Sequence, residues 1–160
     1  MTFRTHTYNT VVTWTGNRGT GTSGYRDYDR SHDLTAEGPA PIAGSSDPAF
    51  RGDPTRWNPE QLLLGALSQC HMLAYLSLCA GNGVTVIEYD DAAHGTMAEN
   101  RDGGHFTEAV LRPRVVVAAP DMVAAAESLH HDAAKSCFIA ASVNFPVRHE
   151  PTVVVRGDDA

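Results

Sequence analysis

The sequence predicts an α+β fold in which two helices pack among antiparallel strands. A long apolar helix is expected over residues 59–80, and a shorter alanine-rich helix over residues 122–137. Segments rich in Val, Thr and aromatic residues, which favour strands, lie before, between and after these helices. At 160 residues the chain is expected to form one domain, residues 1–160.

The first third of the chain favours a strand pair followed by a long loop. Residues 5–15 are rich in Thr, Val, Tyr and Trp and predict an opening strand. The turn signal at residues 16–19 and the spacing over residues 20–30 predict a hairpin, with a short continuation at residues 31–36. Residues 37–57 contain four prolines and predict a long loop that leads to the central helix.

The central helix has clear start and stop signals. Asn58 is a favourable N-cap, Pro59 suits the first helical position, and Gln61 stands where a capping box needs it. Gly81 and Gly83 supply a left-handed stop. Apolar side chains cover every face of this helix, which is about 33 Å long at ~1.5 Å per residue. A single chain of this size can hardly cover such a helix, so the pattern predicts a partner subunit.

The helix is also long enough to cross a membrane, which takes about 20 mostly apolar residues. We expect no membrane partner, because polar residues interrupt the run, no Lys or Arg cluster flanks it, and its start is capped. The net charge of −7 and the scattered Lys and Arg residues argue against a nucleic-acid partner. Residues 1–10 lack the pattern of a targeting peptide, and the three cysteines have no paired spacing, so a cytoplasmic location with reduced thiols is expected.

Two strand-rich segments follow the central helix. Residues 84–97 and 106–119 are separated by a glycine-containing turn and predict a hairpin. Pro113 lies within the second of these segments and predicts an edge strand or a bulge, because proline cannot donate a ladder hydrogen bond.

The last part of the chain predicts one helix and one strand. Asp121 is expected to cap the second helix. Residues 145–155 predict a closing strand, and residues 156–160 a frayed polar tail.

Cys70 is the first candidate for chemistry, and its position in the middle of an apolar helix leaves two interpretations. One is a small buried side chain whose thiol is inert. The other is a nucleophile, which requires a fixed cation beside it because the thiolate is the reactive form. The candidates for that cation are Arg18, Arg51 and Arg56, each near a Gly- or Pro-marked bend. Glu60 is suited to hold such a guanidinium in place, or is only a favourable acid in a first helical turn.

Helix geometry limits which of these residues meet. Glu60 and Cys70 differ by about 15 Å in height and about 80° in direction on a straight helix. One arginine cannot easily bridge them within a chain, but two helices packed antiparallel would bring Glu60 of one subunit toward Cys70 of the other. Cys79 lies about 180° away from Cys70 and about 13 Å along the axis, so these two cannot form a disulfide, and Cys79 is expected in the core.

Other kinds of site have little support. His71, His130 and His131 together with cysteines would suit a metal, but no CxxC, HxxxH or HxH spacing occurs, so no metal is expected. The sequence contains no GxSxG elbow, phosphate-binding loop or dinucleotide fingerprint, and no organic cofactor is expected.

Three motifs resemble one known family. The segments NPEQLLLGALSQCHM, CFIAASVNFPV and WTGNRGTGT together are similar to the OsmC/Ohr family of thiol-dependent peroxidases, and the resemblance runs over nearly the whole chain. It implies an OsmC-like fold, with sheets wrapped around two central helices in an intertwined homodimer and active sites at the subunit interface. It also implies that Cys70 is the peroxidatic thiol, Cys137 the resolving thiol, Arg18 the activating cation and Glu60 its anchor. The second motif lacks the proline that follows this cysteine in typical Ohr members.

These observations predict an antioxidant enzyme of the oxidative stress response. In this hypothesis Cys70 is oxidised to a sulfenic acid by an organic, lipid-like hydroperoxide, Cys137 resolves it, and an external dithiol reduces the disulfide. The alternative is a non-enzymatic OsmC-like protein that binds small apolar ligands or senses oxidants through the same thiols. Arg51 and Arg56 remain possible substitutes for Arg18.

Overall fold

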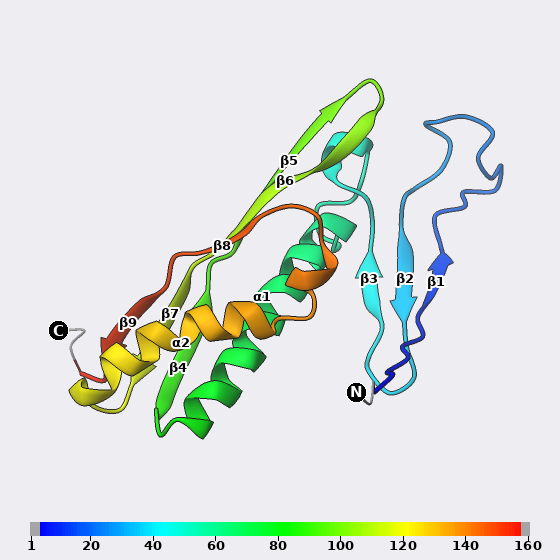
Figure 1. Ribbon diagram of the computed structural model, residues 1–160. Helices are drawn as coiled ribbons and strands as arrows, with labels where there is room; N and C mark the ends of the chain where they lie inside the picture. The colour runs from blue at the N-terminus through cyan, green and yellow to red at the C-terminus, as the bar shows by residue number, and fades with distance from the viewer. Residues whose placement is uncertain (1–3, 158–160) are drawn as a thin grey trace. The chain divides into compact units, whose positions relative to one another are not determined.

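A computed structural model describes residues 4–157 (Figure 1). The chain forms two compact units, and the boundary between them falls at Leu62 and Leu63, in the first turn of the central helix. Part of the expected tail, residues 158–160, lies outside the described residues.

The first unit contains a three-stranded antiparallel sheet in the order β1-β2-β3. Its strands are β1 (Val11–Trp14), β2 (His32–Thr35) and β3 (Ile42–Gly44), and a 3-10 helix, η1 (Pro48–Phe50), follows. The opening strand and the short continuation are confirmed in part, as β1 and β2. The expected strand over residues 20–30 is wrong, because this segment runs as turns and bends with one isolated bridge, Asn17 to Tyr28.

The expectation that residues 37–57 form only a loop is also wrong. Within this segment, β3 pairs with β2 through Leu34 opposite Ile42. Trp57 then extends the contact, because its backbone N–H donates to Ala43 O at 3.1 Å. The long connection is therefore part of a sheet rather than a free loop.

Helix α1 (Pro59–Gly81) forms as the capping signals predict. The Gln61 N–H donates to Asn58 Oδ1 at 2.8 Å, and the Asn58 N–H donates to Gln61 Oε1 at 3.1 Å, which is a reciprocal capping box. At the other end, Gly83 adopts φ +72°, and the Val84 N–H donates to Cys79 O at 2.9 Å. Both boundaries therefore follow from local hydrogen bonding.

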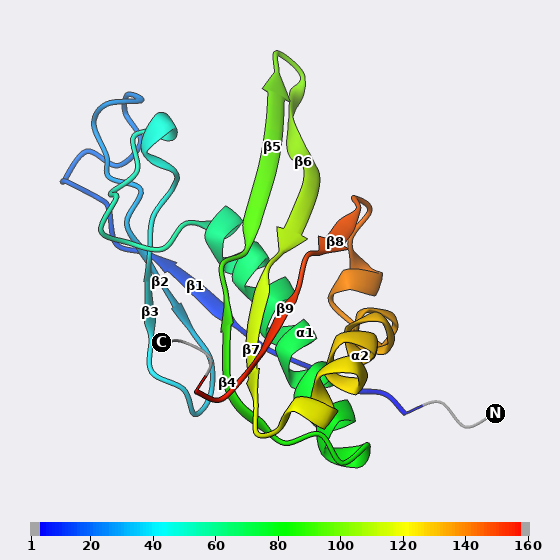
Figure 2. The same cartoon turned by 90° about the vertical axis from the view of Figure 1, so that its left-hand side faces the viewer.

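The second unit has two three-stranded sheets, with strand orders β4-β7-β9 and β5-β6-β8. The predicted hairpin is present, but its two ends belong to different sheets. Near the turn β5 pairs with β6, and at the other end β4 pairs with β7, both antiparallel. Its β5–β6 end projects away from the helices of this unit (Figure 2). The strands are β4 (Val86–Asp91), β5 (His94–Asn100), β6 (Gly103–Leu111), β7 (Pro113–Val117), β8 (Val147–His149) and β9 (Thr152–Val155).

Two strand predictions in this unit need correction. Pro113 marks neither an edge strand nor a bulge: β7 is the central strand of its sheet, and Pro113 is its first residue, where a missing N–H is tolerated. The closing strand is split at Glu150 and Pro151 into β8 and β9. These two halves pair parallel with β6 and β7, whereas antiparallel pairing was expected.

Helix α2 (Val123–Ser136) follows a 3-10 turn, η2 (Pro120–Met122). The expected cap at Asp121 is wrong, because Met122 occupies the N-cap position and Asp121 lies inside η2. Cys137 adopts an extended conformation and ends the helix, and η3 (Ala140–Ser142) comes next.

The core of the second unit lies between α1, α2 and the β4-β7-β9 sheet. Its buried members are Tyr75, Cys79, Val84, Val115, Val117, Ala126, Leu129 and Ala133. Within the described chain only one stripe of α1 is buried, namely Leu67, His71, Tyr75 and Cys79. Leu73, on another face, is 61% exposed. Among the described residues α1 is the one helix whose length and composition would allow a membrane crossing, a test that core helices of soluble proteins also pass.

Candidate active site

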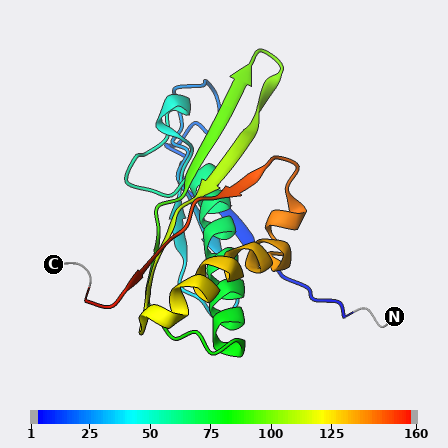
Figure 3. The same ribbon diagram turned by 60° about the vertical axis from the view of Figure 1, so that its left-hand side comes forward.

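The site is built where α2 crosses α1 in the second unit (Figure 3). Side chains of α1 contact α2 and Cys137, the residue that ends it. The Tyr75 hydroxyl donates to Ala126 O at 3.1 Å, and His71 Nε2 lies 3.0 Å from His130 Nδ1. Cys70 and Cys137 are also neighbours, close enough that the Cys70 thiol raises the pKa of Cys137.

The two thiols of this pair have different surroundings. Cys70 is half-buried, whereas Cys137 is only 2% exposed. Burial, and next the neighbouring Cys70 thiol, raises the pKa of the Cys137 thiol well above its usual range. The backbone N–H of Ala140 points at Cys137 Sγ at 3.4 Å and opposes this effect. Both thiols are free in the structure.

Cys79 lies in the core, as predicted. It is 1% exposed and belongs to the cluster that includes Tyr75 and Ala126. Burial raises the pKa of the Cys79 thiol, and the neighbouring Tyr75 partly offsets this effect. These surroundings suit an inert structural thiol.

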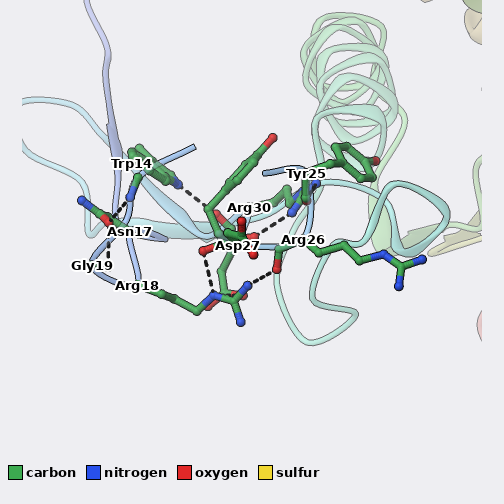
Figure 4. A network of polar contacts seen from close by, with 11 residues as sticks. Trp14, Asn17, Arg18, Gly19, Tyr25, Arg26, Asp27 and Arg30 are labelled. Atoms are coloured by element: carbon green, nitrogen blue, oxygen red, sulfur yellow. Dashed lines mark hydrogen bonds and ion pairs between the residues drawn. The ribbon is translucent and has the colours of Figure 1, made fainter. Parts of the chain in front are cut away.

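Arg18 lies in the first unit, where its guanidinium is turned toward its own loop (Figure 4). Arg18 Nε donates to Asp27 O at 3.3 Å, and Nη2 donates to Arg26 O. Asp29 Oδ1 is 3.8 Å from Arg18 Nε. The guanidinium is therefore fixed by backbone carbonyls of the loop, although the side chain remains 49% exposed.

Side chains hold the rest of this loop in place. Trp14 Nε1 donates to Asp29 O at 2.8 Å, and Asn17 Oδ1 accepts from the backbone N–H groups of Gly19 and Gly21 at 2.8 and 3.0 Å. The Arg30 guanidinium lies over the Tyr25 and Tyr28 rings, 4.4 and 4.1 Å from their centroids. Side-chain bonds, rather than a strand ladder, therefore position Arg18.

The alternative cations and the predicted anchor also lie in the first unit. Arg56 Nη1 donates to His32 O at 3.0 Å and lies 3.6 Å from Asp33 Oδ1, while Arg51 is exposed with φ 65°. Glu60 stands in the first turn of α1, and its Oε2 is buried with no hydrogen-bond partner among residues 4–157. An unsatisfied carboxylate oxygen is an acceptor available to a guanidinium. The activating role of Arg18 and the anchoring role of Glu60 stay predictions.

Sequence reasoning missed a histidine cluster, formed by the buried His71 on α1, the buried His130 on α2 and the half-buried His149 on β8. The His71 ring centroid is 5.4 Å from that of His130 and 4.3 Å from that of His149, and the Tyr75 ring stacks on His130 at 3.9 Å. Burial lowers the pKa of His71 to about 3 and that of His130 to about 4. The spacing of His71, Tyr75 and Cys79 along one helical face could have indicated that His71 is buried, although not which residues it meets.

The sequence places His71, His130 and His131 together as candidate metal ligands. The structure brings the first two together but leaves His131 exposed. Among the described residues, no group of three or more His, Cys, Asp or Glu side chains is arranged to hold a metal ion.

Comparison with known proteins agrees with this architecture. An OsmC-like protein of unknown function from Vibrio cholerae O1 biovar eltor is 32% identical, with a TM-score of 0.82 over 92% of this chain and 100% of that chain. An organic hydroperoxide resistance protein from Elizabethkingia anophelis shares the fold at 14% identity, with a TM-score of 0.67 over 96% and 99% of the two chains. The organic hydroperoxide resistance protein OhrB of Bacillus subtilis does so at 17% identity, with a TM-score of 0.60 over 92% and 98%.

Sequence comparison gives the same assignment. No curated protein matches the chain significantly. Residues 52–152 match the family described as OsmC-like protein, and this span contains both α1 and α2 with their cysteines. The chain belongs to the OsmC-like family.

Proposed function

We propose that this protein is a thiol-dependent peroxidase that reduces organic hydroperoxides. The observation that carries the proposal is the pair of neighbouring free thiols, the half-buried Cys70 on α1 and the buried Cys137 directly after α2. A peroxidatic and a resolving thiol need this arrangement, since a disulfide requires Cα atoms within about 7 Å of each other.

In the first step the Cys70 thiolate attacks the distal oxygen of the hydroperoxide. The O–O bond breaks, the sulfur becomes a sulfenic acid, and the departing alkoxide takes up a proton to leave as an alcohol. Cys137 then attacks the Cys70 sulfur, forming the disulfide and releasing water. An external dithiol returns both thiols by exchange and is itself oxidised to a disulfide.

The order of the two thiols follows from their surroundings. Cys70 is the more accessible sulfur, whereas Cys137 is 2% exposed and its raised pKa keeps it protonated at neutral pH. Cys137 therefore remains a protonated thiol until Cys70 has been oxidised, and it then acts as the resolving residue.

Activation of Cys70 is assigned to Arg18, with Glu60 holding the guanidinium. We propose that the site is shared in a homodimer, in which Glu60 of one subunit approaches Cys70 of its partner. Two observations support this assembly: only one stripe of α1 is fully buried in its own chain, with Leu73 61% exposed on another face, and Glu60 Oε2 lacks a partner among the described residues. Arg51 and Arg56 are the alternatives to Arg18.

The substrate class is assigned from the apolar side chains around the thiols. Phe138, directly after Cys137, is 79% exposed, and Leu73 near Cys70 is 61% exposed. Exposed apolar groups favour an organic hydroperoxide over hydrogen peroxide. The names of the Elizabethkingia anophelis and Bacillus subtilis proteins point to the same substrates. We place the reaction in the cytoplasm, where thiols are kept reduced.

The second candidate function is a non-enzymatic binding or redox-sensing protein. The observation that favours it is that Arg18 uses its donors on the carbonyl oxygens of Arg26 and Asp27, within its own loop. In that case the thiols would be oxidised once and would not turn over with a small dithiol.

Turnover distinguishes the two functions. Consumption of cumene hydroperoxide is measured with dithiothreitol or dihydrolipoamide for wild type, Cys70→Ser and Cys79→Ser. The peroxidase proposal expects turnover in wild type, its loss in Cys70→Ser, and near wild-type rates in Cys79→Ser, which changes a core thiol outside the pair. Wild type that fails to turn over with either dithiol would favour the binding function.

A further inference from the structure

The cluster of His71, His130 and His149 has no part in the proposed chemistry, yet it lies at the same helix crossing as the two thiols. Cys70 and His71 are adjacent on α1, His130 lies on the buried face of α2, and Cys137 directly follows the end of that helix at Ser136. The His71 to His130 hydrogen bond, the Tyr75 to Ala126 bond, the stacking of Tyr75 on His130 and the apolar core together keep α2 against α1.

The hydrogen bond in this cluster depends on charge. His71 Nε2 and His130 Nδ1 lie 3.0 Å apart, so one nitrogen must carry the proton and the other must be a lone pair. If the accepting ring takes up a second proton, both facing nitrogens become donors and the bond is replaced by repulsion. The outer nitrogens, His71 Nδ1 and His130 Nε2, are buried without a partner in the described chain, so a new charge would find no compensation there.

Few groups facing the cluster can compensate a positive charge. On α1 and α2 its neighbour is Tyr75, which is neutral and stacks on His130. From β4 come Tyr89, which contacts Tyr75, and Asp91, a carboxylate that acts on His149.

The other charged side chains near the cluster are either already paired with other groups or exposed. Asp91 already accepts from Ser68 Oγ at 2.5 Å and from the Arg112 N–H at 2.7 Å. On β8, the residues on either side of His149 are exposed and paired with other partners, Arg148 with Glu108 at 2.9 Å and Glu150 with Arg112 at 2.9 Å. On α2, Asp132 and Lys135 are exposed and pair with each other at 3.9 Å.

We propose that His71, His130 and His149 form an acid-opened latch, which holds α2 on α1 while its imidazoles are neutral and releases α2 when they are protonated. On the proposed function, the closed latch keeps Cys137 beside Cys70, so opening would leave oxidised Cys70 as an unresolved sulfenic acid. The pKa values agree with a closed latch at neutral pH, since burial lowers the pKa of all three imidazoles, and the attraction of Asp91 partly offsets this for His149.

Hydrogen exchange tests the latch without using the chemistry. Amide exchange of wild type is followed by mass spectrometry between pH 7 and pH 4.5, with rates divided by the intrinsic rate at each pH. We expect the protection of α2 (residues 123–136) to fall about tenfold or more toward pH 4.5, while the β5–β6 hairpin keeps its protection. Constant protection of α2, or equal loss in every segment, would overturn the proposal.

Two variants refine this test. His130→Gln replaces the imidazole with a neutral amide that can still hydrogen bond, and should flatten the pH dependence of α2 protection. His131→Gln changes the exposed neighbour on the same helix and should behave as wild type. If His130→Gln folds poorly, the amide protection of α2 compared with that of the β5–β6 hairpin in wild type still tests the latch.

The link to resolution is tested by oxidising each protein with one equivalent of cumene hydroperoxide in the presence of dimedone at pH 7 and pH 4, the lower pH lying near the pKa of His130. Comparing the proteins at the same pH cancels the common effect of acid on thiol chemistry. At pH 4 we expect wild type to carry a larger share of dimedone-trapped Cys70, about threefold or more, than His130→Gln, which should still form the disulfide. Equal shares would overturn the link to resolution. If Cys70 is not oxidised at pH 7 in any protein, the proposed function fails, while hydrogen exchange still decides the latch.

Discussion

The Tyr75 hydroxyl donates a 3.1 Å hydrogen bond to Ala126 O, and this buried bond ties the middle of α1 to the first turn of α2. Nearby, Tyr89 has a buried hydroxyl with no partner in the part of the chain that the structure describes. The two tyrosines contact each other, with ring centroids 5.9 Å apart, and so form a matched pair for mutation.

Tyr75→Phe should lower the free energy of unfolding by about 1 kcal/mol, the usual net value of one intramolecular hydrogen bond. Tyr89→Phe removes an unsatisfied hydroxyl and should be neutral or slightly stabilising. Urea unfolding of both variants measures the difference. Equal destabilisation by the two changes would mean that the Tyr75 to Ala126 bond contributes nothing.

Stability should fall as the pH drops from about 6.5 toward 4. In the unfolded chain histidines take up protons near pH 6.5, whereas in the folded protein burial lowers the pKa of His130 to about 4 and that of His71 to about 3. Because the unfolded state binds more protons in this window, each group costs about 1.4 kcal/mol of stability per pH unit. Urea midpoints at pH 7, 6 and 5 test this, and a midpoint independent of pH would contradict the burial of neutral imidazoles.

Arg18→Met should slow alkylation of Cys70 by iodoacetamide at neutral pH, because the thiolate loses its compensating cation. The matched control is Arg26→Met, which removes an exposed side chain of the same loop whose backbone carbonyl still holds Arg18. The rate is followed by peptide mass spectrometry. An unchanged rate in Arg18→Met would transfer the activating role to Arg51 or Arg56.

One equivalent of organic hydroperoxide should produce an intramolecular disulfide between Cys70 and Cys137, with Cys79 still reduced. Cys137 is already close enough for Cys70 to act on its thiol, while Cys79 lies in the core beside Tyr75. Cys137→Ser should stop at sulfenic acid and proceed to sulfinic acid with excess peroxide. Peptide mapping that found a Cys70 to Cys79 link, or a disulfide between subunits only, would refute this assignment.

The protein should sediment as a dimer, since only one stripe of the apolar helix α1 is fully buried in one chain and Leu73 on another face is exposed. Leu73→Glu places a charge on an uncovered face and should shift the population toward monomer or aggregate. Ala124→Glu adds the same charge at an exposed position of α2 and serves as control. A stable folded wild-type monomer at low concentration would count against the shared site.

The features that sequence alone determined are those that depend on neighbouring residues. The start of α1 follows from the Asn58 and Gln61 capping box, and its end from Gly83 at positive φ, so both boundaries were predictable. Family motifs likewise pointed to Cys70 and Cys137 before the two thiols were seen to be neighbours.

Tertiary structure alone decided the features that join distant segments. Local propensity could not choose between partners for the closing strand, and β8 and β9 pair parallel with strands reached through an entire helix. Asp121 has good capping chemistry, yet Pro120 begins a 3-10 turn that moves the cap to Met122. The histidine cluster combines one residue from each of α1, α2 and β8, and no spacing along the chain records that these three meet. Pairing and burial depend on packing between elements, which a linear pattern does not contain.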